Sequence, residues 1–183
     1  LHGSSAASDV YKRQVHNGII ENNADLKAQL KAEGIRFSTQ TDTEVIAHLI
    51  RMFVEKGQSF EKAVFNTLKK LKGAYALGII DKNDPEQIIG VRNQSPLVLG
   101  KGFQENFIAS DVMALAPVTN KFVYLDDGQV AILNNQKAVV KNTSNKIIRT
   151  KTHEVDSNAY TADTGGYSHF MEKEIFEQPQ AVK

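Results

Sequence analysis

Residues 68–81, Leu-Lys-Lys-Leu-Lys-Gly-Ala-Tyr-Ala-Leu-Gly-Ile-Ile-Asp, contain the point at which the hydrophobic pattern of the chain changes. Before Gly73, apolar residues recur every three or four positions, a spacing that favours helices with one buried face. After Gly73, strand-length apolar runs are separated by turn residues. Helices followed by many short strands predict a mixed, layered α+β domain rather than a doubly wound fold.

The helical part predicts three helices, over residues 25–34, 41–57 and 59–72. The extended part predicts strands over residues 74–81, 87–92, 97–100, 106–110, 122–125, 129–133, 137–140 and 146–149. One helical turn is expected at residues 111–115. Asp126-Asp127-Gly128 favours a hairpin between the two strands beside it, and the last two strands are expected to form another.

The composition is that of an ordinary globular domain, with 41% hydrophobic and 23% charged residues in a chain of 183. The net charge is +1, with no block of one sign of the kind that nucleic acids or anionic membranes select. No run of about 18 apolar residues predicts a membrane span. We therefore expect a cytoplasmic domain that binds neither nucleic acid nor membrane.

The chain contains no cysteine, which excludes disulfides, thiolate metal sites and a cysteine nucleophile within these 183 residues. Its five histidines, at positions 2, 16, 48, 153 and 169, do not follow a metal-ligand spacing. We expect no metal and no cofactor.

The first fourteen residues, LHGSSAASDVYKRQ, are small and polar, and they follow neither a helical nor a strand period. The patterned sequence begins abruptly at Val15. We predict that residues 1–14 are a non-native or disordered leader, and we exclude them from the fold. A mobile native arm is the alternative.

His16-Asn17-Gly18 lies between apolar residues. Taken alone, Asn-Gly favours a tight turn, because both residues tolerate positive φ. The alternative is an oxyanion hole, in which the Asn17 amide and the Gly18 backbone N–H donate to one developing negative charge. No partner identifies His16 as a general base, so we expect a structural role for this residue.

Thr41-Asp42-Thr43-Glu44 has the spacing of a capping box, in which Thr41 or Asp42 caps the helix and Glu44 completes the box. The alternative is that Asp42 faces a site and binds a ligand ammonium group. Near the end of the chain, residues 169–178 predict a short helix that ends before Pro179. That stretch suits an interdomain connector or a domain edge.

Six segments in register resemble one family, the glutamine:fructose-6-phosphate amidotransferases, also called glucosamine-6-phosphate synthases. They are His-Asn-Gly-Ile-Ile-Glu-Asn (16–22), Thr-Asp-Thr-Glu-Val-Ile-Ala-His-Leu (41–49), Leu-Lys-Gly-Ala-Tyr-Ala (71–76), Ser-Pro-Leu-Val-Leu-Gly (95–100), Glu-Asn-Phe-Ile-Ala-Ser-Asp (105–111) and His-Phe-Met-Glu-Lys-Glu-Ile-Phe-Glu-Gln-Pro (169–179). The last segment favours this family over the related amidophosphoribosyltransferases and asparagine synthetases.

The resemblance implies a class II glutamine amidotransferase with an N-terminal-nucleophile hydrolase fold, a four-layer αββα sandwich. In that family an N-terminal cysteine attacks L-glutamine, and the released ammonia passes to a sugar-isomerase domain that acts on fructose 6-phosphate. By their match to the family motif, Asn17 and Gly18 would form the oxyanion hole, and Asp42 would bind the glutamine α-ammonium. The full-length protein would be a homo-oligomer.

The chain also departs from the family pattern. It lacks the nucleophilic cysteine and the Arg-Trp-containing loop that binds the glutamine carboxylate. We therefore expect residues 15–155 to be a partial glutaminase domain that is incomplete at its N-terminus and inactive by itself. Residues 156–183 would be the end of that domain and the start of a connector to the isomerase domain. A degenerate, non-catalytic module that binds a ligand or a partner is the alternative.

Overall fold

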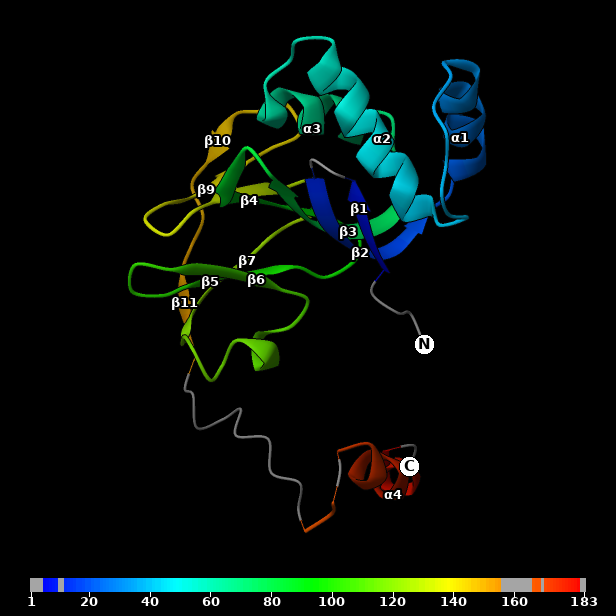
Figure 1. Ribbon diagram of the computed structural model, residues 1–183. Helices are drawn as coiled ribbons and strands as arrows, with labels where there is room; N and C mark the ends of the chain where they lie inside the picture. The colour runs from blue at the N-terminus through cyan, green and yellow to red at the C-terminus, as the bar shows by residue number, and fades with distance from the viewer. Residues whose placement is uncertain (1–4, 10–11, 156–165, 169, 182–183) are drawn as a thin grey trace.

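The computed structural model describes residues 5–9, 12–155, 166–168 and 170–181. In this part of the chain two antiparallel sheets are stacked face to face, and three helices cover the outer face of the larger sheet (Figure 1). The α+β class expected from the sequence is therefore confirmed.

The larger sheet has the strand order β1-β2-β3-β4-β8-β9-β10. Its strands are β1 Ser5–Asp9, β2 Lys12–Ile20, β3 Gly73–Asp81, β4 Asp84–Asn93, β8 Val130–Leu133, β9 Ala138–Lys141 and β10 Ile147–Ile148. The smaller sheet has the order β11-β7-β5-β6. Its strands are β5 Val98–Lys101, β6 Asn106–Ala109, β7 Lys121–Tyr124 and β11 His153–Glu154.

The described helices are α1 Asn23–Ala32, α2 Asp42–Glu55, α3 Phe60–Leu68, the 3-10 helix η1 Val112–Ala114, and α4 Phe170–Ala181. They agree with the predicted helices to within a few residues at most ends, although α3 ends four residues earlier than expected. None of the helices in the described ranges is long and apolar enough to cross a membrane.

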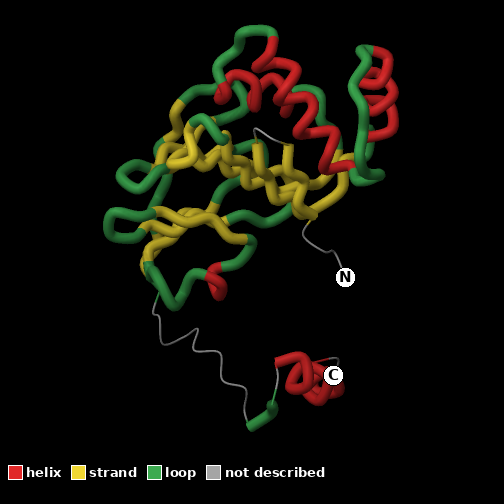
Figure 2. The backbone as a smooth tube through the Cα atoms, in the orientation of Figure 1, coloured by secondary structure: helices red, strands yellow, loops and turns green. Residues whose placement is uncertain are grey.

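Figure 2 shows the two sheets one above the other, with helices over the outer side of one of them. Three clusters of buried apolar side chains hold these elements together. The largest lies between α1–α3 and the larger sheet, where Ile46 and Ile50 of α2 meet Leu77 and Ile79 of β3. The second fills the space between the sheets, and the third lies beneath η1. Each fully buried side chain of this size contributes roughly 1.5–3 kcal/mol.

Residues 5–9 and 12–14, which were expected to belong to a non-native or disordered leader, lie in strands of the larger sheet. Ser5–Asp9 pairs with β2, and β2 itself begins at Lys12 and pairs with β3 over nine positions. Gln14 is buried and its side-chain amide donates to the Thr43 carbonyl. Backbone pairing places these residues in the sheet although their side chains carry no strand pattern. The non-native origin of residues 1–14 stays a prediction.

The hairpin expected across Asp126-Asp127-Gly128 is wrong, because its two strands belong to different sheets. β7 pairs with β5 in the smaller sheet, and β8 pairs with β4 in the larger one. The turn is bound to the end of β4 instead, where Gly128 N donates to Arg92 O at 2.8 Å. The other predicted hairpin is confirmed, since β9 pairs with β10.

The last predicted helix is present, but α4 continues past Pro179 to Ala181. Proline removes a single hydrogen bond at this position close to the end of the helix. Residues 156–165 and 169, which belong to the predicted end of the domain and connector, lie outside the described residues.

Candidate functional site

The His16-Asn17-Gly18 segment lies inside strand β2, so the turn favoured by its sequence is wrong. Asn17 is in register with Ala76 of β3, and Gly18 is in register with Tyr75. The nine-position ladder with β3 overrides the local preference of Asn-Gly for a turn. Gly18 nevertheless has φ +127°, a backbone conformation that side chains with a Cβ rarely adopt.

Close packing against β3 also requires glycine at position 18. A Cβ built there would lie 2.1 Å from the carbonyl oxygen of Ala74 and 2.7 Å from the Cα of Tyr75. Both are backbone atoms of a central strand and have little room to move. The glycine that suggested a turn is therefore needed for a close contact between β2 and β3.

The side chains of β2 alternate between its two faces. Gln14, His16 and Ile20 are buried on the face toward the helices. Val15 and Asn17 line a groove of about 470 Å³ on the opposite face. The rest of its wall is mainly apolar, with residues such as Ala76 and Ile80 from the larger sheet and Leu97 and Ile108 from the segments of the smaller sheet.

The Asn17 side chain is half-buried in the wall of this groove. Within the described ranges, no residue forms a hydrogen bond with its amide group. An amide donor held on a rigid strand beside apolar surface can stabilise a negative charge more strongly than a donor in water can. This is the chemistry that an oxyanion hole requires.

Asp42, the first residue of α2, is bound to the same strand. Its Oδ2 accepts a hydrogen bond from Ile20 N at 2.9 Å, and its side chain is 21% exposed. Thr43, the next residue, receives a hydrogen bond from Gln14 through its carbonyl. The first turn of α2 is therefore attached to β2 on both sides of Gly18.

His16 is buried between β2 and the first turn of α2, with 1% of its surface exposed. Its Nδ1 lies 3.0 Å from Thr43 Oγ1 and 3.7 Å from Asp42 Oδ1. Burial lowers the pKa of His16, and the opposing effect of the Asp42 charge is smaller. The imidazole is accordingly neutral near pH 7, and it faces away from the groove that Asn17 lines. This geometry supports the structural role expected for His16.

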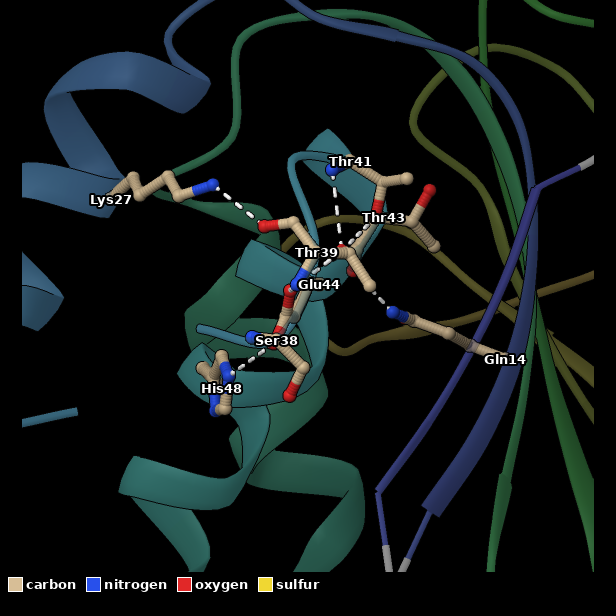
Figure 3. A network of polar contacts seen from close by, with 8 residues as sticks. All are labelled: Gln14, Lys27, Ser38, Thr39, Thr41, Thr43, Glu44 and His48. Atoms are coloured by element: carbon tan, nitrogen blue, oxygen red, sulfur yellow. Dashed lines mark hydrogen bonds and ion pairs between the residues drawn. The ribbon is translucent and has the colours of Figure 1, made fainter. Parts of the chain in front are cut away.

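The predicted capping box is not formed as its spacing suggested. Thr41 occupies the N-cap position, but its side chain makes no capping hydrogen bond. Glu44 instead accepts hydrogen bonds from Ser38 N at 2.6 Å, Thr39 N at 2.7 Å and Thr39 Oγ1 at 2.6 Å (Figure 3). The chain before α2 folds back over the helix, so these donors reach Glu44 in place of Thr41 N.

Glu44 is thereby an ionised anchor for the loop that leads into α2. Burial opposes its ionisation, but the hydrogen bonds from Ser38 and Thr39 and the contact with His48 outweigh that effect and lower the pKa of Glu44 to about 2. His48 Nε2 lies 3.3 Å from Glu44 Oε1, and its ring packs edge-on against Phe37. The loop before Asp42 is therefore fixed at several points.

Sequence reasoning named Asn17, Gly18 and Asp42 as candidates but did not single out Gln14 and Thr43, which join β2 to the first turn of α2. Gln14 was excluded with the leader, and Thr43 was regarded as one position of a helix cap. Residues 14, 16, 18 and 20 alternate along one strand, and this pattern could have predicted that Gln14 lies on the same face as His16, toward α2. Within the described residues, no group of three or more histidine, cysteine, aspartate or glutamate side chains could hold a metal ion.

Comparison with known sequences gives matches over most of the chain. The family described as "Glutamine amidotransferase domain" matches residues 6–117. The glutamine--fructose-6-phosphate aminotransferase [isomerizing] of Thermococcus kodakarensis is 48% identical over 170 residues, which cover 92% of this chain and 28% of that protein. The protein of the same name from Vibrio vulnificus is 41% identical over 187 residues, covering 99% of this chain and 31% of that protein.

Solved structures give a similar result. The glutamine phosphoribosylpyrophosphate amidotransferase from B. subtilis, complexed with ADP and GMP, matches with a TM-score of 0.64 and 27% identity. The match covers 81% of this chain and 33% of that one. A structure described as the allosteric regulatory enzyme of purine biosynthesis matches with a TM-score of 0.63 and 26% identity, covering 78% of this chain and 31% of that one. The chain thus spans about a third or less of the length of these relatives.

Proposed function

The chain belongs to the glutamine amidotransferase domain family, and from this we propose that it is the glutaminase part of a glutamine--fructose-6-phosphate aminotransferase. The N-terminal-nucleophile hydrolase-type fold expected from the sequence is confirmed by the structural neighbours. In the full-length protein, this part would hydrolyse L-glutamine and supply ammonia for the conversion of fructose 6-phosphate to glucosamine 6-phosphate.

Asn17 and Gly18 are the proposed oxyanion donors, through the side-chain amide and the backbone N–H. Removal of one such donor from an enzyme typically costs about 100- to 1,000-fold in rate. Asp42 is the proposed anchor for the α-ammonium of glutamine. The observation that carries the proposal is their common attachment to β2, because Asn17 and Gly18 belong to the strand and Asp42 is bound to it through Ile20 N.

The 183 residues contain no cysteine, which supports the absence of glutamine hydrolysis by this chain itself. We propose that residues 15–155 are part of the glutaminase domain, whose larger sheet also includes residues 5–9 and 12–14, and that residues 156–183 lead to the isomerase domain, which binds the sugar phosphate. The full-length protein would be a cytoplasmic homo-oligomer.

A second function, that of a non-catalytic module of the same fold, is favoured by one observation. A chain without cysteine can still bind glutamine through Asp42 and Asn17, and it would then act by binding alone. Recovery of the reading frame upstream of residue 1 distinguishes the two functions. An initiator Met-Cys-Gly start supports the amidotransferase, and its absence supports the module.

Titration of the chain with L-glutamine by isothermal calorimetry tests the proposed site. We expect Asp42→Asn to weaken binding about 10- to 100-fold, because an ammonium group loses a charged hydrogen-bond acceptor. Asp25→Asn is the matched control, since Asp25 also lies in the first turn of a helix. Equal binding by the wild-type chain and Asp42→Asn would contradict the assignment of Asp42. Release of glutamate by the purified chain would contradict the absence of hydrolysis.

A further inference from the structure

Both carboxylate oxygens of Asp42 are held by groups that come from β2 or are bound to it. Oδ2 accepts the hydrogen bond from Ile20 N at 2.9 Å. Oδ1 lies 3.5 Å from Thr43 Oγ1, which in turn lies 3.0 Å from His16 Nδ1. Thr43 and His16 are almost completely buried, whereas the Asp42 side chain is 21% exposed. Water therefore reaches the carboxylate but not the two groups behind it.

The direction of these contacts follows from the surroundings of His16. A neutral imidazole has one N–H, and a buried N–H without an acceptor is costly. His16 Nε2 is buried and has no hydrogen-bond partner among the residues that the structure describes. The proton is therefore placed on Nδ1, which donates to Thr43 Oγ1. The threonine hydroxyl then has its own hydrogen available for Asp42 Oδ1.

We propose that His16 and Thr43 are positioning residues that orient the Asp42 carboxylate for the α-ammonium of glutamine. This inference rests on the proposed role of Asp42. His16 precedes Asn17 in the chain, and its side chain lies on the other face of the strand. One strand thus positions the oxyanion donors from one face and the ammonium anchor from the other.

The test is a double-mutant cycle on the affinity of the 183-residue chain for L-glutamine, measured by calorimetry. Thr43→Val removes the hydroxyl and keeps the shape, and we expect it to weaken binding about 3- to 10-fold. Thr43→Ser keeps the hydroxyl and is expected to restore most of the affinity. In the Asp42→Asn background, Thr43→Val is expected to cause no further loss, because the hydroxyl acts through the carboxylate.

Thr67→Val provides the matched control. Thr67 is also a fully buried helical threonine, and its hydroxyl has no hydrogen-bond partner among the described residues. We expect this variant to bind L-glutamine as the wild type does. A thermal melt of each variant separates loss of folding from loss of affinity, and a melting-temperature change without an affinity change for Thr43→Val would leave only a structural role and overturn the inference.

The remaining outcomes separate this inference from the proposed function. If Asp42→Asn weakens binding and Thr43→Val does not, the positioning role is overturned and the role of Asp42 stands. An equal loss for Thr43→Val in both backgrounds also overturns the positioning role, because the hydroxyl would then act independently of Asp42. No binding by the wild-type chain, or no effect of Asp42→Asn, overturns both.

Discussion

The loop before α2 depends on one carboxylate, and replacing Glu44 with glutamine tests that dependence. Glu44 is 7% exposed and accepts hydrogen bonds from Ser38 N, Thr39 N and Thr39 Oγ1, with His48 Nε2 at 3.3 Å. Glutamine has nearly the same shape, but it replaces one acceptor oxygen with an NH2 donor. In Glu44→Gln, that NH2 group would face the N–H and hydroxyl donors of Ser38 and Thr39.

The magnitude follows from the pKa of Glu44, which falls from 4.5 to about 2 on folding. At about 1.4 kcal/mol for each pH unit, this difference corresponds to about 3 kcal/mol of folding free energy. The folded-state pKa lies below the unfolded-state value. The contribution is therefore fully present above pH 4.5 and is lost as the pH falls toward 2.

Urea unfolding followed by circular dichroism measures this contribution. We expect Glu44→Gln to lower the free energy of unfolding by about 2–3 kcal/mol near pH 7, and by less than about half of that near pH 3. Glu55→Gln is the control, because Glu55 is 61% exposed and pairs with Arg51 on the helix surface. Its effect should stay within about 0.5 kcal/mol at both pH values. The same loss for Glu44→Gln at both pH values would refute the reasoning.

Two further substitutions, each with a control variant, test a close strand contact and a helix cap by urea unfolding. Gly18→Ala should destabilise the fold by about 3 kcal/mol or more, because the new Cβ meets the Ala74 carbonyl. Gly57 also has positive φ but nothing within 4 Å of an added Cβ, so Gly57→Ala should cost only about 1–2 kcal/mol. Equal losses would show that the close contact at Gly18 is relieved without cost. Ser59→Ala should cost about 0.5–1 kcal/mol, because Ser59 Oγ accepts from Lys62 N at the start of α3. Thr41→Ala removes no capping hydrogen bond, only the exposed contact of Thr41 Oγ1 with Thr39 Oγ1 at 2.8 Å, and should cost less. A larger loss than that of Ser59→Ala would contradict the geometry of the two helix ends.

Local patterns in the sequence predicted the elements whose burial is one-sided. The apolar stripe of α2 is such a pattern. The continuous apolar run of β3 was also predicted, although this strand is buried on both faces, with Leu77 and Ile79 toward the helices and Ala76 toward the smaller sheet. The failures occurred where pairing between distant segments decides the structure. Asp126-Asp127-Gly128 has the composition of a hairpin turn, but it connects two sheets because it is bound to β4.

The candidate site shows the same limit. Asn17-Gly18 has the local features of a turn, and only the ladder with β3 makes it part of a strand. Asp42 has the local features of a helix cap, and its contact with Ile20 N joins residues 22 positions apart. Their chemistry offered a role in a site only as an alternative, and the resemblance to a family favoured that role. The contacts of Gln14 and His16 with Thr43 follow from the packing of α2 against β2, which the local sequence does not predict.

The central claim is that β2 presents Asn17, Gly18 and the Asp42 anchor to one glutamine molecule. Residue-resolved nuclear magnetic resonance measures it most directly, by following the Asn17 side-chain amide and the backbone amides of Gly18 and Ile20 during titration with L-glutamine. We predict that all three signals shift with a single dissociation constant, while the amide of Gly57, at the far end of α2, does not move. A shift of Ile20 without shifts of Asn17 and Gly18, or no shift at any of the three, would contradict the claim.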